Sequence, residues 1–351
     1  MAAAAVLRHV DLLPCMVQFQ GGGYPDMRAL NAYVREHGRS VLYLTQKVSV
    51  STYNLQLASI LVGFRDLFAP WLAFHGLSRV ARLISSSSNM GAFVVVSAIY
   101  AGDAAILQLY CQQIQLPPSY PLVDIAAWAD QLDALCLVHT YGATGTTNAM
   151  DVAARDGHEA ILAFLHEHRQ DGCTRAAMNL AARFNHLQVV SYLQVHRTEG
   201  CSSDALVWAA TAGHLAMVQF LFEHYSDTIT TPLAMDGASQ NGHLDVVRFL
   251  DAQGQTCTTD AVDHASLNGH LNVVTFLLQN RPEGATTRAM SYAAASGHLE
   301  VVQFLRQANV PASMRTAMLN ARKNGHHNIV QYLCEADPSV VGQLGNLGIN
   351  V

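Results

Sequence analysis

A histidine recurs at nearly constant spacing between residues 158 and 326, and this period constrains the fold more than any other feature of the sequence. The spacing is 27 to 29 residues, and the positions are His158, His186, His214, His243, His270, His298 and His326. The flanking residues repeat as well, as in Gln-Asn-Gly-His243-Leu-Asp-Val-Val-Arg-Phe-Leu. Gln131 and Asp103 hold the same place in two weaker copies, so nine units run in register. Such a period is typical of a stack of similar structural units.

The residue pattern of each unit predicts two helices joined by a Gly-His turn. Small or apolar residues recur nine, eight, five and four positions before the histidine, as Ala289, Met290, Ala293 and Ala294 do before His298. This spacing forms one stripe of a helix. After the histidine, apolar residues fall at the first, third, fourth, sixth and seventh positions. This second pattern predicts a helix that buries most of its surface.

The ends of the first helix carry signals of their own. A Thr or Ser precedes the apolar stripe, as at Thr146, Ser202 and Thr286, and its hydroxyl can accept a hydrogen bond from the first helical turn. A Gly stands directly before most of the histidines, as Gly242 does. Glycine readily adopts the left-handed conformation that ends a helix. We therefore expect the first helix to end at this Gly.

The repeated residues resemble the ankyrin repeat, which runs Thr-Pro-Leu-His-x-Ala-Ala-x-x-Gly-His-x-x-Val-Val-x-Leu-Leu. The family's usual period is about 33 residues, so about five residues are missing per unit, and the opening survives only as Thr231-Pro232-Leu233. We expect the missing residues to come from the β-hairpin finger, as in similar compact repeats of families expanded in microbial eukaryotes. The resemblance implies an all-α fold, an α-solenoid of stacked helix-turn-helix repeats over residues 90–335. A helical N-terminal cap would occupy residues 1–89 and a C-terminal tail residues 336–351.

The N-terminal region is less regular. Helical patterning covers Asp26 to His37 and Asn54 to Phe64, a β-prone run spans Val41 to Ser51, and Trp71 to Ile84 holds a candidate degenerate repeat. We expect a cap, because a terminal repeat needs a polar outer face. The alternative is that Leu12-Leu13-Pro14 resembles the Leu-Pro opening of an F-box, which would make the chain a substrate adaptor of a ubiquitin ligase. A scaffold that joins two proteins is the third hypothesis.

The resemblance implies a non-enzymatic module that binds a protein partner through the concave face, which the first helices line in the ankyrin family. Six positions before the histidine the residues vary, and we expect them to be exposed: Val152, Leu180, Trp208, Gly237, His264, Tyr292 and Asn320. Aromatic and arginine side chains dominate interface energies. Our candidate partner-binding residues are Trp208, Tyr292, Arg155, Arg183 and Phe184. The alternative for Trp208 and Phe184 is that they pack partly between neighbouring repeats, because large aromatic residues are mostly buried on average.

The histidines do not predict a metal site. Stacked helices lie about 8 to 10 Å apart, too far for successive repeat histidines to share a zinc ion, so we expect them to hydrogen-bond turn backbone. We expect His166-Glu167-His168 in a solvated loop, and Cys173, Cys201 and Cys257 mark one equivalent position, thirteen residues before a repeat histidine. No phosphate-binding loop, Cys-x-x-Cys or Gly-x-Ser-x-Gly motif occurs. We therefore expect no enzyme, cofactor or metal.

Composition narrows the class of partner and the compartment. The chain has 20 Lys plus Arg against 26 Asp plus Glu, a net charge of −6, and no basic stripe, which argues against nucleic acid. The odd number of seven cysteines and the lack of a secretory signal indicate an intracellular protein, most simply cytoplasmic. The uncharged run from Leu83 to Gly102 is interrupted by Ser85 to Ser88, so we expect no membrane association. We also expect a monomer.

Overall fold

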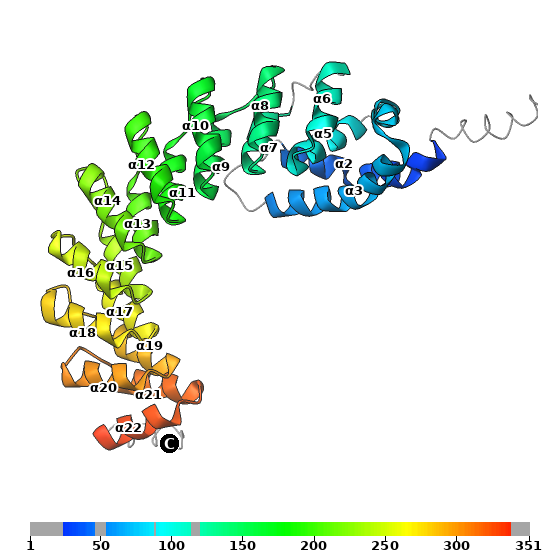
Figure 1. Ribbon diagram of the computed structural model, residues 1–351. Coiled ribbons are helices and arrows are strands. Elements are labelled where there is room, and N and C mark those ends of the chain that lie inside the picture. Colours follow the sequence, from blue (N-terminus) through cyan, green and yellow to red (C-terminus); the bar gives the residue numbers. More distant parts are fainter. Residues whose placement is uncertain (1–23, 46–53, 88, 114–119, 338–351) are drawn as a thin grey trace, which may run out of the picture. The chain divides into compact units, whose positions relative to one another are not determined.

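The computed structural model describes residues 24–45, 54–87, 89–113 and 120–337, which form helices joined by short turns (Figure 1). No strand occurs in these ranges. The residues fall into two compact units, Met1–Ala177 and Met178–Val351. The predicted all-α repeat fold is confirmed, and the connections between its described repeats hold turns in place of β-hairpin fingers.

Nine helix pairs follow one another in the described part of the chain. In the N-terminal unit the pairs are α5 (Met90–Ala101) with α6 (Ala104–Gln113), α7 (Leu122–Trp128) with α8 (Leu132–Thr140), and α9 (Thr147–Asp156) with α10 (Glu159–His168). Then come α11 (Arg175–Arg183) with α12 (Leu187–His196), α13 (Ser203–Thr211) with α14 (Leu215–Tyr225), and α15 (Pro232–Gln240) with α16 (Leu244–Ala252). The last pairs are α17 (Asp260–Leu267) with α18 (Leu271–Asn280), α19 (Arg288–Ser296) with α20 (Leu299–Gln307), and α21 (Met314–Lys323) with α22 (His327–Ala336). Each repeat histidine, or the residue in its place, directly precedes the second helix of its pair.

Two long helices precede the pairs, α2 (Arg28–Thr45) and α3 (Asn54–His75). Both predicted helical segments are confirmed, and both helices run further than predicted. The prediction of a β-prone run from Val41 is wrong as far as Thr45, where α2 continues. Val41 and Leu44 are buried on the same face of α2 as Leu30. Packing of this face therefore outweighs the β-preference of the β-branched Val41. Residues 46–51 of that run lie outside the described residues, as do Leu12-Leu13-Pro14 and the tail after residue 337.

The candidate degenerate repeat at Trp71 to Ile84 is not a helix pair. It consists of the end of α3, the 3-10 turn η2 (Leu77–Arg79) and the five-residue α4 (Val80–Ile84). The guanidinium of Arg79 binds the carboxylate of Asp26 through two hydrogen bonds of 2.9 and 3.0 Å. This ion pair joins η2, which follows α3, to the start of the described chain.

One helix in the described ranges, Leu55–His75 within α3, is long and apolar enough to cross a membrane by length and composition alone. Its Leu61 and Phe64 are buried against α2 and α5, and the other faces carry exposed residues such as Leu55 and Phe74. The uncharged run that ends at Gly102 contains α5, which is buried along most of its length. The absence of a membrane partner stays a prediction.

The predicted inward faces and helix caps are confirmed in the repeats. Ala289, Met290, Ala293 and Ala294 of α19 are all at most 1% exposed. The hydroxyl of Thr146 accepts a hydrogen bond of 3.1 Å from the N–H of residue 148, and Ser202 and Thr286 cap their helices in the same way. Within the C-terminal unit the small inward residues let consecutive first helices pack more closely than the second helices do. The first helices therefore line one side of that unit and the second helices the other (Figure 1).

A glycine before the repeat histidine also makes room for the histidine of the next repeat. Gly242 has a φ of +79°, and a Cβ added to it would lie 2.5 Å from Nδ1 of His270. The same close approach occurs between Gly213 and His243. The ring nitrogen of His326 lies 3.0 Å from the carbonyl oxygen of Ala295, which agrees with the predicted role in binding turn backbone.

We expect Gly242→Ala to lower the free energy of unfolding more than Gly325→Ala. Both glycines have a φ near +80°, at +79° and +81°, so alanine strains each backbone by about 1 to 2 kcal/mol. Only Gly242 faces an imidazole, because a Cβ at Gly325 would have nothing within 4 Å. Urea denaturation of both variants measures the difference. Equal losses would show that His270 does not need this space.

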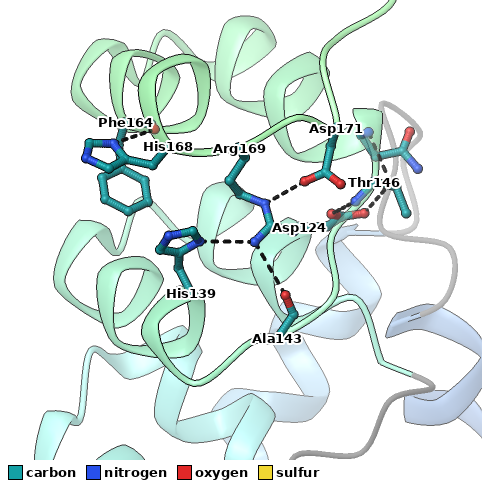
Figure 2. A network of polar contacts seen from close by, with 9 residues as sticks. Asp124, His139, Ala143, Thr146, Phe164, His168, Arg169 and Asp171 are labelled. Carbon is teal, nitrogen blue, oxygen red and sulfur yellow. Dashed lines mark hydrogen bonds and ion pairs between the residues drawn. The ribbon is translucent and has the colours of Figure 1, made fainter.

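Buried carboxylates, and in one repeat a buried amide, form rungs between consecutive first helices, and these rungs were not predicted from the sequence. Asp124 of α7 accepts hydrogen bonds from the N–H of Thr146, at 2.8 Å, and from its hydroxyl, at 2.6 Å (Figure 2). Equivalent pairs are Asp151 with Thr174, Asn179 with Ser202, Asp236 with Thr258, and Asp263 with Thr286. The first residue always lies seven positions before its repeat histidine or the residue in its place, so a signal was present in the sequence. Each rung fastens the cap of one repeat to the helix of the preceding repeat.

Candidate functional site

The outward side chains of the first helices form one surface in the C-terminal unit, which we call the first-helix strip. It consists of Arg183, Phe184, Trp208, Thr211, Gln240, Asn241, His264, Leu267, Asn268, Tyr292, Asn320 and Lys323, all of which are exposed or half-buried. Consecutive first helices from α13 to α21 are in contact, so these side chains lie on neighbouring elements. The strip brings together four of the five predicted partner-binding residues: Trp208, Tyr292, Arg183 and Phe184.

An aromatic and arginine cluster lies at the α11 end of the strip. The guanidinium carbon of Arg183 lies 5.5 Å from the ring centroid of Phe184 and 5.5 Å from that of Trp208. Phe184 is 49% exposed, so about half of its side chain is available to solvent. Trp208 is half-buried, which leaves part of its indole available to solvent. The cluster therefore combines two residue types that contribute strongly to protein interfaces.

The centre of the strip is neutral and rich in hydrogen-bonding groups. The rings of His264 and Tyr292 are parallel, with centroids 6.5 Å apart. The side-chain amide of Asn241 donates a hydrogen bond of 2.6 Å to the carbonyl oxygen of Thr211, and that of Asn268 donates one of 2.7 Å to Gln240. These two asparagines were not predicted from the sequence, although both stand two residues before a repeat histidine. They hold adjacent first helices together at the surface.

Three of the predicted outward positions differ from expectation, and one of them belongs to the predicted site. Val152 and Leu180, six residues before their histidines, are buried, because these branched apolar side chains turn into the packing between repeats. Arg155 lies in the N-terminal unit, where its guanidinium is bound by the carboxylate of Asp156 at 2.5 Å and its side chain is only 12% exposed. The expectation that Arg155 is an exposed arginine is therefore wrong.

Carboxylates are distributed unevenly over the C-terminal unit. None occurs in the first-helix strip, although Asp204 and Asp260 lie at helix starts one turn before Trp208 and His264. The second helices carry acidic side chains instead: Glu223, Asp245, Asp251, Glu300 and Glu335. The strip has cations at its two ends, Arg183 and Lys323, and only uncharged side chains and histidine between them.

Several side chains of the kinds that support chemistry lie within the repeats. His166 and His168 lie in the last turn of α10, so the expectation of a solvated loop is wrong, and the ring of His168 stacks on Phe164 because residues four apart share a helix face. No group of three or more His, Cys, Asp or Glu that could hold a metal ion occurs among the described residues. Burial raises the pKa of the Cys257 thiol to about 11, so this sulfur stays protonated at neutral pH. Burial lowers the pKa of His270, which favours the neutral imidazole bonded to the backbone of Gln240.

Comparison with known protein families identifies the repeat. A family model described as ankyrin repeats in three copies matches residues 235–312 and residues 262–343. A second model, described as ankyrin repeats in many copies, matches residues 150–194. None of the curated proteins matches the chain. The matched ranges cover helix pairs whose first helices contribute most of the first-helix strip.

Proposed function

This chain is an ankyrin-repeat protein, and we propose that it binds a protein partner on the first-helix strip and catalyses no reaction. Ankyrin repeats are generally protein–protein interaction modules. A stack of repeats presents an elongated surface, which suits a macromolecule better than a small substrate. Intracellular location and a monomeric state stay predictions.

The observation that carries this proposal is the composition of the first-helix strip. Within one unit it presents Phe184, Trp208 and Tyr292, together with Arg183. Exposed aromatic side chains on adjacent rigid helices offer a large contact area at a small cost in conformational entropy. The residues of the strip include no carboxylate, and charged residues are depleted from interface centres.

We expect the double substitution Trp208→Ala and Tyr292→Ala to reduce partner binding by roughly thirtyfold or more, because one lost hot-spot side chain costs about 2 kcal/mol. Both side chains are half-buried at the surface, so helicity should be preserved. The measurement is capture of cellular proteins by the immobilised full-length chain, with circular dichroism on the same samples.

A matched control removes two half-buried aromatic side chains from the second helices, Phe220→Ala with Phe304→Ala. This variant should retain the captured partner. The proposal fails if the variant with the substitutions in the strip still captures the partner. It also fails if both variants lose capture of the partner equally, with an equal loss of helicity.

A further inference from the structure

Arg183 is the most strongly oriented cation of the first-helix strip. Its guanidinium contacts the ring of Phe184, which follows it in the chain, and the ring of Trp208 in the next repeat, each at 5.5 Å. Contact with aromatic rings uses the flat faces of a guanidinium, whereas its five N–H donors lie in its plane. The two rings therefore restrict the side chain and leave its donors available.

These donors have no acceptor within the described part of the protein. The side chain of Arg183 is exposed and forms neither a hydrogen bond nor an ion pair with any described residue. Two other arginines of the same unit differ, because Arg197 is bound by Glu199 and Arg281 by Glu283. An arginine that is held in place and lacks an anion is suited to bind a carboxylate through two parallel hydrogen bonds.

The rest of the strip determines which kind of carboxylate-bearing partner fits. The residues of the strip include no carboxylate, although Asp204 and Asp260 lie one turn from it, and a second cation, Lys323, is exposed at the far end on α21. Between the two cations the surface is neutral and includes the parallel rings of His264 and Tyr292. Complementary charge selects partners and aligns them on such a surface.

We infer that the first-helix strip takes an extended acidic segment of the partner protein, in which an Asp or Glu side chain pairs with the guanidinium of Arg183. The inference rests on the proposed function and names the class of partner. Helices α11 and α21 are five repeats apart. At about 8 to 10 Å per repeat and about 3.3 Å per extended residue, a second acidic residue about 12 to 15 positions away would reach Lys323.

The test uses the full-length chain and displayed random peptides of sixteen residues, flanked on both sides by neutral residues so that no terminus is free. Peptides are selected on the wild-type protein, and their affinities are measured against variants. We expect selected peptides to carry a required Asp or Glu. Arg183→Gln should lower the affinity for these peptides by about tenfold to a hundredfold, as expected for loss of hydrogen bonds to a charged group. Arg183→Lys should also lower this affinity, because lysine keeps the charge but lacks the planar arrangement of N–H donors.

Arg248→Gln is the matched control. Arg248 is exposed and lies 5.6 Å from the ring of Phe276, but it belongs to the second helix α16, so its loss should leave the affinity unchanged. Peptides that need Trp208 and Tyr292 but contain no required acidic residue would overturn this inference and leave the proposed function standing. Peptides that bind the Trp208→Ala, Tyr292→Ala variant as well as the wild type would overturn both. Peptides that bind only when a free C-terminal carboxylate or a phosphoserine stands in place of the acidic side chain would overturn the assignment to Asp or Glu.

Discussion

Replacing Ala238 by aspartate should unfold the middle of the C-terminal unit. Ala238 is fully buried on α15, which packs between α13 and α17. Because no part of its side chain is exposed, a carboxylate at this position would be taken out of water. Burying an unpaired charge costs about 3 to 5 kcal/mol or more, and adding atoms to a packed core costs further free energy. This is a large share of the stability of a typical domain.

The consequence should reach beyond one repeat. Because each repeat is stabilised by its neighbours, loss of the α15 packing uncouples the repeats on either side of it. We expect the variant to melt at a lower temperature and over a broader range than the wild type, as followed by circular dichroism. The matched control is Gln240→Asp, which places the same side chain at an exposed position of the same helix and should change the melt little. An Ala238→Asp melt that coincides with the wild type would contradict the inward assignment of this helix face.

The rung formed by Asp124 should make the stability of the N-terminal unit depend on pH. Burial raises the pKa of Asp124 to about 6, an effect that its hydrogen bonds with Thr146 oppose. Nearby Asp171 also raises this pKa, and Arg169, which binds Asp171, lowers it (Figure 2). A folded-state pKa above the unfolded value means that the folded protein holds the proton more tightly. The free energy of unfolding should therefore fall as pH rises from about 4 to about 6 and change little above that.

The chain offers a neutral version of this rung that serves as the control. Asn179 makes both bonds with Ser202, accepting from its N–H at 3.0 Å and donating to its hydroxyl at 2.7 Å. Asp124→Asn should therefore keep the rung, remove the dependence on pH between 4 and 6, and be at least as stable as the wild type at pH 7.

Asp124→Ala should be less stable than Asp124→Asn at every pH, by about 1 to 3 kcal/mol, because the N–H and hydroxyl of Thr146 lose their acceptor. Urea denaturation of the three proteins at pH 4.5 and pH 7 gives these differences. Parallel profiles for the wild type and Asp124→Asn would show that the ionised carboxylate is not destabilising.

The regular part of the fold was predictable because repetition averages out local ambiguity. A single stretch such as Val41 to Thr45 was misassigned, since its β-branched side chain outweighed a helical period that becomes clear only when α2 is seen packed. The stripe at Ala289 and Met290 could not be misassigned in the same way, because it recurs in unit after unit at the same distance from a histidine. The cap at Thr146 was predictable for the same reason.

The candidate site was predicted less well, because exposure depends on what the neighbouring repeat contributes. Positions six residues before the histidine look equivalent in sequence, yet Leu180 is buried and Trp208 is half-buried. Arg155 and Arg183 occupy the same place in consecutive repeats, three residues before the histidine. Asp156 follows the first and neutralises it, whereas Phe184 follows the second and stacks on it. One residue of sequence context therefore separates a paired arginine from an available one.

The sequence by itself determined the repeat unit, its register, its inward face and the ends of its first helices, because these features depend on interactions within about ten residues. Only the tertiary structure decided the rungs from Asp124 to Thr146 and its equivalents, the space that Gly242 leaves for His270, and the placement of Arg183 against Trp208. Each of these joins residues 22 to 28 positions apart in adjacent repeats. Their geometry follows from how closely the small inward residues let the helices approach, which no single repeat specifies on its own.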